Sequence, residues 1–376
     1  MKKVKAGIIG CGMISDIYLQ SLTGQFQILE TVACADRHLN RAKKKAEKYG
    51  IRALSIQEML EDPEITMILN LTSPAGHYEI TRQALEHDKH VYSEKMMALE
   101  LEEGKELCQM ADQRGKRLGV APDTFLGGSI QTARYIVDRG LIGQPLSVVV
   151  SLNRNFTVFG DILPFLHKKG GNIPYDVGCY YMTALAYILG PAERISSFSR
   201  KYKPERISLR ADRPWYGEKI HVEGDNILTS TIQYQNGVLG TIHLNGESIQ
   251  NENQHLEIYG TDGILIMGNP NNFDSPVYIR KPMHEAIEFP FTHGFTRNVR
   301  GLGAAEMAWA MDQNRPHRAS KEMAYHVFEI MHGMEISAHE ERIYKIGSSF
   351  ERPEALPEGY LPNGAWGPCE ESALIY

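Results

Sequence analysis

Three side chains in this sequence could move a proton to or from a substrate, namely those of Lys95, Asp176 and Tyr180. Lys95 follows the short apolar segment His90–Ser93, and an amine at a strand end beside a bound ligand can be desolvated and act as a general acid or base. Asp176, Tyr180 and Thr183 follow the spacing i, i+4, i+7 and share one face of a predicted helix. Polar groups in a row on an otherwise apolar helix favour a polar partner or a cleft.

Each of these positions also has an ordinary structural interpretation. Glu94 and Lys95 could form an ion pair at the surface. Asp176 lies near the N-terminus of its predicted helix and could cap it, and Tyr180 could belong to the core. A catalytic role therefore needs a binding site beside these residues.

A glycine pattern near the N-terminus predicts such a site. The apolar run Val4–Ile9 ends in Gly10-x-Gly12-x-x-Ser15 and leads into a helical pattern. Gly10 permits a tight turn, Gly12 lets the backbone approach phosphates, and the small Ser15 stands where a third glycine or alanine is usual. The helix N-terminus then offers free N–H groups to a dinucleotide pyrophosphate. The predicted contacts in this loop are Gly10, Gly12, Met13 and Ile14.

The end of the second predicted strand bears on the choice of dinucleotide. The run Ile28–Ala35 ends at Asp36, about 20 residues beyond the glycines, where an acidic side chain can accept a ribose 2′-hydroxyl. A carboxylate would repel a 2′-phosphate, so Asp36 favours NAD. Arg37 could instead pair with that phosphate, which keeps NADP as an alternative, and Asp36 could also cap the next helix.

Composition places the chain among ordinary globular proteins. It has 376 residues, 42% of them apolar and 23% charged, and a net charge of -6, which gives no indication of nucleic-acid binding. Five cysteines without a CxxC motif favour free thiols and a reducing compartment. We find no signal peptide, no membrane-length apolar run and no zinc-type histidine spacing, so we expect a cytoplasmic protein without a metal or a membrane partner.

Two patterns of secondary structure follow one another along the chain. Up to about Ala121, short apolar strands alternate with helices, which predicts βαβ units and a parallel sheet, here an NAD(P)-binding α/β Rossmann domain over residues 1–122. Many strands and hairpin turns follow, including Asn236-Gly237 and Asp262-Gly263. They predict an α+β substrate-binding domain with a largely antiparallel open sheet over 123–352. A tail rich in proline and glycine occupies 353–376.

In this combination the motifs resemble the Gfo/Idh/MocA oxidoreductases, named for glucose-fructose oxidoreductase and inositol dehydrogenase. The family pattern of a nucleotide fold, a Glu-Lys-Pro motif and a helix with Asp-x-Gly-x-His or -Tyr is similar to Gly10–Ser15, Glu94-Lys95 and Asp176–Tyr180. The resemblance implies Lys95 as the catalytic lysine, Asp176 as a substrate-orienting or proton-relaying acid, and Tyr180 as an acid or base. It also implies substrate contacts from Thr183. The cofactor-binding residues implied outside the glycine loop are Asp36, Arg37, Ser73, Pro74, His77, Glu94 and Lys95.

Two residues depart from the family pattern. Met96 replaces the usual proline after the lysine, where some members have a cis peptide bond that costs about 2.5–4 kcal/mol without proline. Thr183 stands where many members carry a second acid. With Tyr180, it makes the chain more similar to the sugar-oxidising branch than to the inositol branch.

We expect an NAD(P)-dependent dehydrogenase that acts on a CH–OH group of a sugar, polyol or glycoside, in a homodimer or homotetramer. One alternative is an NAD-dependent glycosidase or lyase that oxidises a sugar carbon transiently, eliminates the glycosidic group and returns the hydride. Another is a non-catalytic cofactor-binding protein, because a fold alone does not fix a function.

Overall fold

The computed structural model describes residues 3–357, which form two compact units. Each unit takes up segments that lie far apart in the sequence, so the chain leaves the first unit and later returns to it. The segments are residues 3–126, His293–Ala324 and 356–357 in the first unit, and Gly127–Thr292 and Tyr325–Ala355 in the second. Of the predicted tail, residues 358–376 lie outside the described residues.

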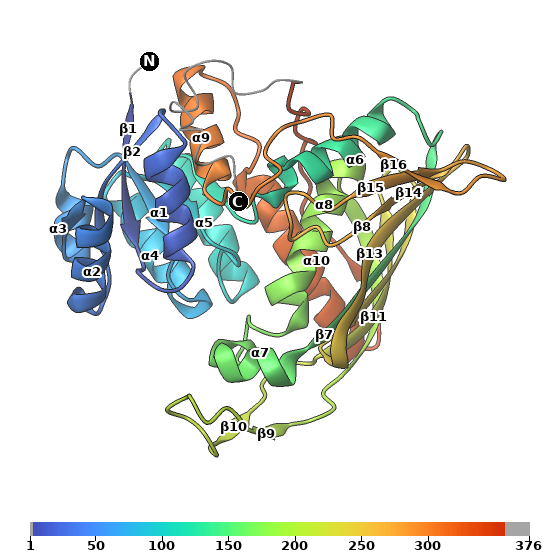
Figure 1. The fold of residues 1–376 in the computed structure, drawn as a ribbon, viewed down its shortest axis with the longest axis horizontal. Helices are drawn as coiled ribbons and strands as arrows, with labels where there is room; N and C mark the ends of the chain where they lie inside the picture. The colour runs from blue at the N-terminus through green and yellow to red at the C-terminus, as the bar shows by residue number, and fades with distance from the viewer. Residues whose placement is uncertain (1–2, 358–376) are drawn as a thin grey trace. The chain divides into compact units, whose positions relative to one another are not determined.

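A parallel sheet forms the core of the first unit (Figure 1). Its six strands lie in the order β3-β2-β1-β4-β5-β6, and every neighbouring pair is parallel. The strand order reverses at β1 and β4, and ligands of such sheets bind outside the carboxyl ends of the strands at that point. The strands are β1 (Val4–Ile9), β2 (Leu29–Ala35), β3 (Arg52–Ala53), β4 (Met67–Asn70), β5 (His90–Ser93) and β6 (Leu118–Val120).

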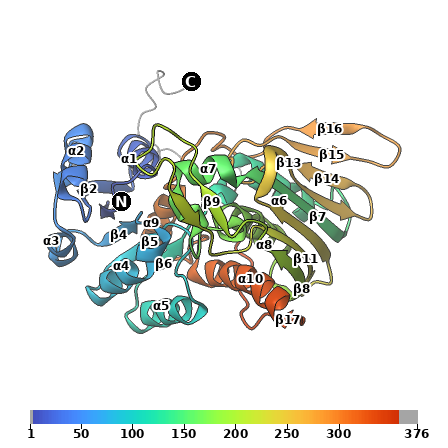
Figure 2. The ribbon, with the colours of Figure 1, turned by 90° about the horizontal axis from the view of Figure 1, so that it is seen from below.

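Helices cover both faces of this sheet, with α1 and α2 above it and α4 and α5 below it in Figure 2. The strand order reverses between β1 and β4, so crossovers that follow the usual right-handed rule place helices on both faces. Pro74 begins α4, where its missing N–H costs no hydrogen bond. The helices are α1 (Ser15–Gly24), α2 (Leu39–Tyr49), α3 (Ile56–Glu61), α4 (Pro74–Glu86) and α5 (Leu101–Gln113), followed by the 3-10 turn η1 (Thr124–Leu126).

Helix α9 (Leu302–Asp312) joins the first unit from a distant part of the sequence. Asp123 Oδ2 accepts the backbone N–H groups of Gly301 at 2.8 Å and Gly303 at 3.0 Å, and so caps the start of α9. Gly303 packs directly on Tyr92, since a Cβ there would lie 2.2 Å from the tyrosine oxygen. The helix can approach the sheet this closely only with glycine at that position.

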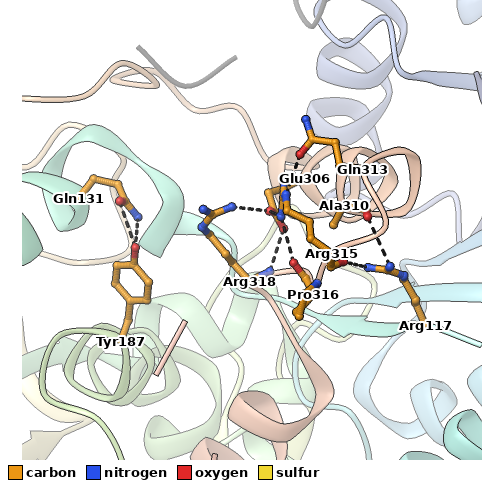
Figure 3. Close-up of polar contacts among 9 residues, drawn as sticks. All are labelled: Arg117, Gln131, Tyr187, Glu306, Ala310, Gln313, Arg315, Pro316 and Arg318. Atoms are coloured by element: carbon orange, nitrogen blue, oxygen red, sulfur yellow. Dashed lines mark hydrogen bonds and ion pairs between the residues drawn. The ribbon is translucent and has the colours of Figure 1, made fainter. Parts of the chain in front are cut away.

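A buried carboxylate holds the segment after α9, as Figure 3 shows. Glu306 is fully buried, and its Oε1 accepts hydrogen bonds from Nη1 of Arg315 at 2.6 Å and of Arg318 at 2.8 Å. Arg117, next to β6, donates to the carbonyl oxygens of Ala310 and Arg315 near the C-terminal end of α9. Charge-assisted bonds therefore tie both α9 and the loop after it to the sheet edge.

The second unit is built on a nine-stranded sheet in the order β16-β15-β14-β13-β7-β12-β11-β8-β17. All neighbouring pairs are antiparallel except β7 and β12, which are parallel. A separate antiparallel ribbon pairs β9 with β10. The strands are β7 (Pro145–Asn155), β8 (Ala192–Arg200), β9 (Glu205–Ile207), β10 (Lys219–His221), β11 (Ile227–Tyr234), β12 (Leu239–Asn245), β13 (Glu247–Gly260), β14 (Ile264–Met267), β15 (Val277–Arg280), β16 (Ala286–Phe289) and β17 (Tyr344–Lys345).

Helices α6, α8 and α10 lie on one face of this sheet (Figure 1). Gln131 of α6 and Tyr187 of α8 are fully buried and exchange hydrogen bonds of 2.9 and 3.1 Å (Figure 3). The opposite face carries Phe198, which is 82% exposed. The helical segments are α6 (Gly128–Asp138), α7 (Phe156–Ile162), η2 (Pro164–His167), η3 (Pro174–Gly178), α8 (Cys179–Leu189) and α10 (Lys321–His339), which belongs to this unit from Tyr325 onward. A parallel sheet followed by a mostly antiparallel one confirms the predicted fold class.

Candidate cofactor and substrate sites

Gly10 and Gly12 form the turn between β1 and α1, and the structure gives them different roles. Gly10 has φ +107°, and a Cβ there would lie 2.5 Å from the carbonyl group of Leu71. A Cβ on Gly12 would meet no atom of the described residues within 4 Å, its chain neighbours apart. Protein contacts thus require glycine at position 10, whereas the space beside Gly12 is available to a ligand.

The same turn presents the N-terminus of α1. Ser15, the first residue of α1, is fully buried, and its hydroxyl donates to the carbonyl of Gly12 at 2.7 Å. Met13 is 73% exposed, and Ile14, which is half-buried, is the N-cap of the helix. The first N–H groups of a helix have no intrahelical partner and attract anions.

An acidic residue in the first turn of α1 does not cancel this attraction. The Asp16 carboxylate pairs with Lys45, with Lys48 at 3.1 Å and with the Tyr49 hydroxyl at 2.9 Å. These partners, Lys45 first among them, lower the pKa of Asp16 to about 2. Two lysines therefore balance the one carboxylate, and the helix end can still bind phosphate.

Asp36 lies at the carboxyl end of β2 and contacts the glycine loop directly. Its Oδ2 accepts the backbone N–H of Cys11 at 2.8 Å, and its Oδ1 accepts that of His38 at 2.8 Å. A carboxylate has about four lone-pair positions, so two remain for ribose hydroxyls. The N-cap of α2 is His38, so the alternative in which Asp36 caps this helix is wrong. Arg37 is exposed.

The carboxyl end of β4 leads to Ser73 and Pro74, which begin α4, and Ser73 is exposed. His77 is buried one turn later. Its Nδ1 lies 2.5 Å from the carbonyl oxygen of Met96 and its Nε2 lies 2.9 Å from that of Thr72. Burial lowers the pKa of His77, although both ring nitrogens face acceptors. The imidazole thus bridges the backbone after β4 and the backbone beside Lys95.

Glu94 and Lys95 follow β5 directly. Glu94 is 8% exposed, accepts the Tyr18 hydroxyl at 2.7 Å through Oε1, and accepts the backbone N–H of Lys95 at 3.1 Å through Oε2. Glu94 is therefore not part of a surface ion pair. Lys95 is half-buried, and the Lys95–Met96 peptide bond is cis although residue 96 is not proline. The backbone that carries the lysine is thus held on both sides, by Glu94 and by His77.

In the second unit, Asp176 lies in the π-helical turn Pro174–Gly178, which continues directly as α8. Tyr180 and Thr183 follow in the first turns of α8 and are 7% and 4% exposed. The N-cap of the π turn is Ile173, so Asp176 does not cap it. Single π turns within helices are frequent at functional sites. The role of this segment stays a prediction.

Sequence reasoning missed Arg154 at the end of β7. Its Nη1 lies 4.0 Å from Asp176 Oδ2, and its guanidinium carbon lies 4.1 Å from the ring centroid of Phe159. The signal was available, because every second side chain from Val148 to Leu152 is apolar and buried, and Arg154 continues that face. The structure thus adds a cation to the predicted acid.

The part of the chain that the structure describes holds neither a cluster of metal-binding side chains nor a membrane-spanning helix. Between residues 3 and 357 no three or more His, Cys, Asp or Glu side chains group as they would around a metal ion. In the same part of the chain no helix has the length and hydrophobicity that crossing a bilayer requires.

Comparison with known proteins gives two family matches. Residues 4–121 match the oxidoreductase family with an NAD-binding Rossmann fold, and residues 130–266 match the GFO/IDH/MocA C-terminal domain. The first match covers the parallel sheet, and the second covers most of the mixed sheet.

Curated relatives are similar at low identity. D-glucoside 3-dehydrogenase of Escherichia coli is 28% identical over 244 residues, which are 62% of this chain and 68% of the relative. The scyllo-inositol 2-dehydrogenase (NAD(+)) of Bacillus subtilis is 25% identical over 270 residues, 71% of this chain and 74% of the relative. Inositol 2-dehydrogenase of Salmonella typhimurium is 29% identical over 150 residues, 39% of this chain and 44% of the relative.

Solved structures share the fold over nearly the whole chain. Levoglucosan dehydrogenase in complex with NADH and levoglucosan has a TM-score of 0.80 at 18% identity and covers 92% of this chain and 99% of its own. An NAD-binding oxidoreductase from Klebsiella pneumoniae has a TM-score of 0.79 at 18% identity, with coverage of 92% and 100%. Since the two family matches span more than half of its residues, this chain belongs to the GFO/IDH/MocA family of oxidoreductases, whose N-terminal domain is an NAD-binding Rossmann fold.

Proposed function

We propose that this oxidoreductase transfers a hydride between a hydroxyl-bearing carbon of a sugar, polyol or glycoside and NAD. The relatives named above, which act on glucosides and inositols, support this substrate class. NADP remains the alternative cofactor, through Arg37.

The first unit fits a dinucleotide through three of its features. The space beside Gly12 admits a pyrophosphate that a Cβ would displace, the start of α1 offers N–H donors, and Asp36 keeps acceptor capacity for a ribose. When bound, the nicotinamide ring accepts or returns the hydride.

The residues proposed to act on the substrate are Lys95, Asp176 and Tyr180. During oxidation, the proton of the reacting hydroxyl passes to Lys95 Nζ in its neutral amine form or to Tyr180 Oη in its phenolate form. Asp176 accepts a hydrogen bond from the substrate and orients the hydroxyl, and Thr183 contributes a further polar contact. Lys95 must hold one orientation while the proton moves.

One observation carries this proposal: the backbone of Lys95 is fixed from both sides by buried groups. Glu94 accepts the Lys95 N–H and is itself held by Tyr18, while His77 contacts the Met96 carbonyl. An ordinary surface lysine needs no such support. A buried framework that positions one strand-end amine is typical of a catalytic group.

The experiment is steady-state turnover by Lys95→Met on a panel of sugars, inositols and glycosides with both cofactors. We expect turnover to fall by at least about 100-fold, the usual scale for a general acid or base, while NADH binding stays within about 3-fold of wild type. Lys95→Arg is the matched control, since it keeps the charge but cannot act as a base at neutral pH. Near-normal turnover in both variants would refute the proposed role.

The same assay separates the alternative chemistries. A dehydrogenase releases one NADH for each substrate oxidised. Bound NAD with product formation and no net NADH would indicate transient oxidation and elimination, and NADH binding without any turnover would indicate a non-catalytic protein.

We also propose a homodimer or homotetramer that works in the cytoplasm. The open face of the mixed sheet exposes 82% of Phe198 and 56% of Leu239, and such apolar area is typical of an interface. Cys11, Cys34, Cys108 and Cys179 are free thiols, which suits a reducing compartment. Light scattering on the purified protein tests the assembly, and a monomer at micromolar concentration would contradict it.

A further inference from the structure

We infer that Arg154 determines substrate specificity and that, with Asp176, it recognises two neighbouring hydroxyl groups on an uncharged sugar or polyol ring. This inference rests on the proposed function, since it names the part of the substrate that the same site would bind.

Arg154 lies where the pattern of β7 would place an apolar residue. The alternating side chains from Val148 to Leu152 are buried, and Arg154 continues their face with 19% of its side chain exposed. Removing a guanidinium from water costs free energy unless its N–H groups find acceptors. The hydrogen-bond acceptors around Arg154 therefore indicate whether it stabilises the fold or binds a ligand.

The contacts of Arg154 with the described residues leave its donors largely unused. Nη1 is 4.0 Å from Asp176 Oδ2, which is beyond hydrogen-bonding distance, whereas a bidentate pair would bring the atoms to about 2.8 Å. The Phe159 ring centroid, 4.1 Å from the guanidinium carbon, attracts the charge but accepts none of its N–H groups in the plane of the guanidinium. The N–H donors of this group are thus available to a bound molecule.

Arg206 in the same unit shows the contrasting, structural case. It is 7% exposed, forms an ion pair with Glu247 and donates to the Thr157 hydroxyl at 2.5 Å. Its carboxylate partner therefore lies in direct contact, as expected where a buried arginine stabilises the fold. Arg154 lacks a partner of this kind among the described residues.

The charges of the pair indicate which ligand fits. Asp176 accepts a hydrogen bond and Arg154 donates one, and each ring hydroxyl can do both. One hydroxyl can donate to Asp176 Oδ2 while its neighbour accepts from Arg154 Nη1. A carboxylate or phosphate on the substrate would approach Asp176 as well as Arg154, and like charges at that distance repel.

The test compares Arg154→Met with wild type on the best substrate of the panel, on its analogue lacking the hydroxyl next to the oxidised carbon, and on its carboxylated analogue. Methionine keeps the apolar stem against Phe159 but removes the donors. We expect KM for the full substrate to rise about 10- to 100-fold with kcat within about 3-fold, and KM for the deoxy analogue to change by less than about 3-fold. Arg154→Lys should recover part of the loss.

Arg206→Met is the matched control: we expect a lower melting temperature and unchanged discrimination between full and deoxy substrate. Equal loss on both substrates in Arg154→Met, unchanged KM, or an effect confined to the carboxylated analogue would each overturn the inference while the proposed function stands. If wild type binds NADH but oxidises no polyol, the proposed function fails, and the inference fails with it.

Discussion

The Asp36 carboxylate accepts the backbone N–H of Cys11 at 2.8 Å, so the acid at the end of β2 is bonded to the residue between the two loop glycines. Its other oxygen holds the N–H of His38. The group expected to bind the ribose therefore also fixes the loop expected to bind the pyrophosphate. Substitutions of Asp36 should act on both parts of the dinucleotide site.

For Asp36→Asn we expect the affinity for NADH to fall by at least about 10-fold, because an amide has only one acceptor oxygen for the two N–H groups. Preference for NADH over NADPH should fall as well, since the repelling charge is gone. Fluorescence titration with both nucleotides measures this. Arg37→Ala should weaken NADPH binding more than NADH binding, because its guanidinium is the group that could pair with a 2′-phosphate. Tighter binding of NADPH than NADH by wild type would contradict the assignment.

Alanine at the two loop glycines should have opposite effects on stability and binding. Gly12→Ala places a methyl group in open space, so we expect a free energy of unfolding within about 1 kcal/mol of wild type and NADH affinity reduced at least about 10-fold. Gly10→Ala should cost about 2–4 kcal/mol, because φ is +107° and the methyl group meets the Leu71 backbone. Urea unfolding and NADH titration of both variants check this. Normal cofactor binding by Gly12→Ala would be incompatible with a pyrophosphate beside it.

Asp123 should make stability depend on pH. Burial raises its pKa to about 6, against the opposing effect of the Gly301 and Gly303 N–H groups, so the native state binds the proton more tightly than the unfolded chain. As pH rises from about 4 to 6, the free energy of unfolding should therefore fall, by on the order of 2–3 kcal/mol.

Asp123→Asn cannot titrate and provides the comparison. Its amide oxygen can still accept from the start of α9, so the variant should fold and lose this pH dependence. Urea unfolding of both proteins at pH 4.5 and 7 gives the difference. Parallel profiles for wild type and variant would show that another group is responsible.

Loss of the buried carboxylate at Glu306 should be strongly destabilising. Glu306→Ala leaves Arg315 and Arg318 without their shared acceptor, which we expect to cost about 3–5 kcal/mol of unfolding free energy. Glu64→Ala is the control, because its ion pair with Lys5 is exposed and should contribute less than about 1 kcal/mol. Chemical denaturation measures both, and similar losses would mean that burial of Glu306 does not matter.

Much of the fold could be predicted because its strands are short, apolar and bounded by turn residues. The runs Val4–Ile9 and His90–Ser93 are strands with the predicted limits. Other elements were missed. Strand β3 has two residues and α3 has six, which is too short for a periodic pattern. The parallel pairing of β7 with β12 depends on contacts between strands, which a local pattern does not contain.

The candidate site was predictable where chemistry follows a local motif, as for the glycine loop. Arg154 escaped because an arginine at a strand end usually lies at the surface. The alternation of β7 indicates the face on which it lies, but its contacts with Asp176 and Phe159 come from the structure alone. The return of residues 293–324 to the first unit was equally hidden. It depends on Asp123 holding the N–H of Gly301, and these residues are 178 positions apart.

Helix α9 covers the edge of the parallel sheet at β6, but it is translated long after β6. Gly119 of β6 lies against Met307 of α9, so the nascent chain leaves that edge of the sheet uncovered until translation has passed the helix. While the residues between β6 and α9 are translated, the incomplete first unit exposes apolar surface outside the ribosome. We expect chaperones to bind this surface. Premature stop codons before α9 should yield aggregates instead of a nucleotide-binding fragment.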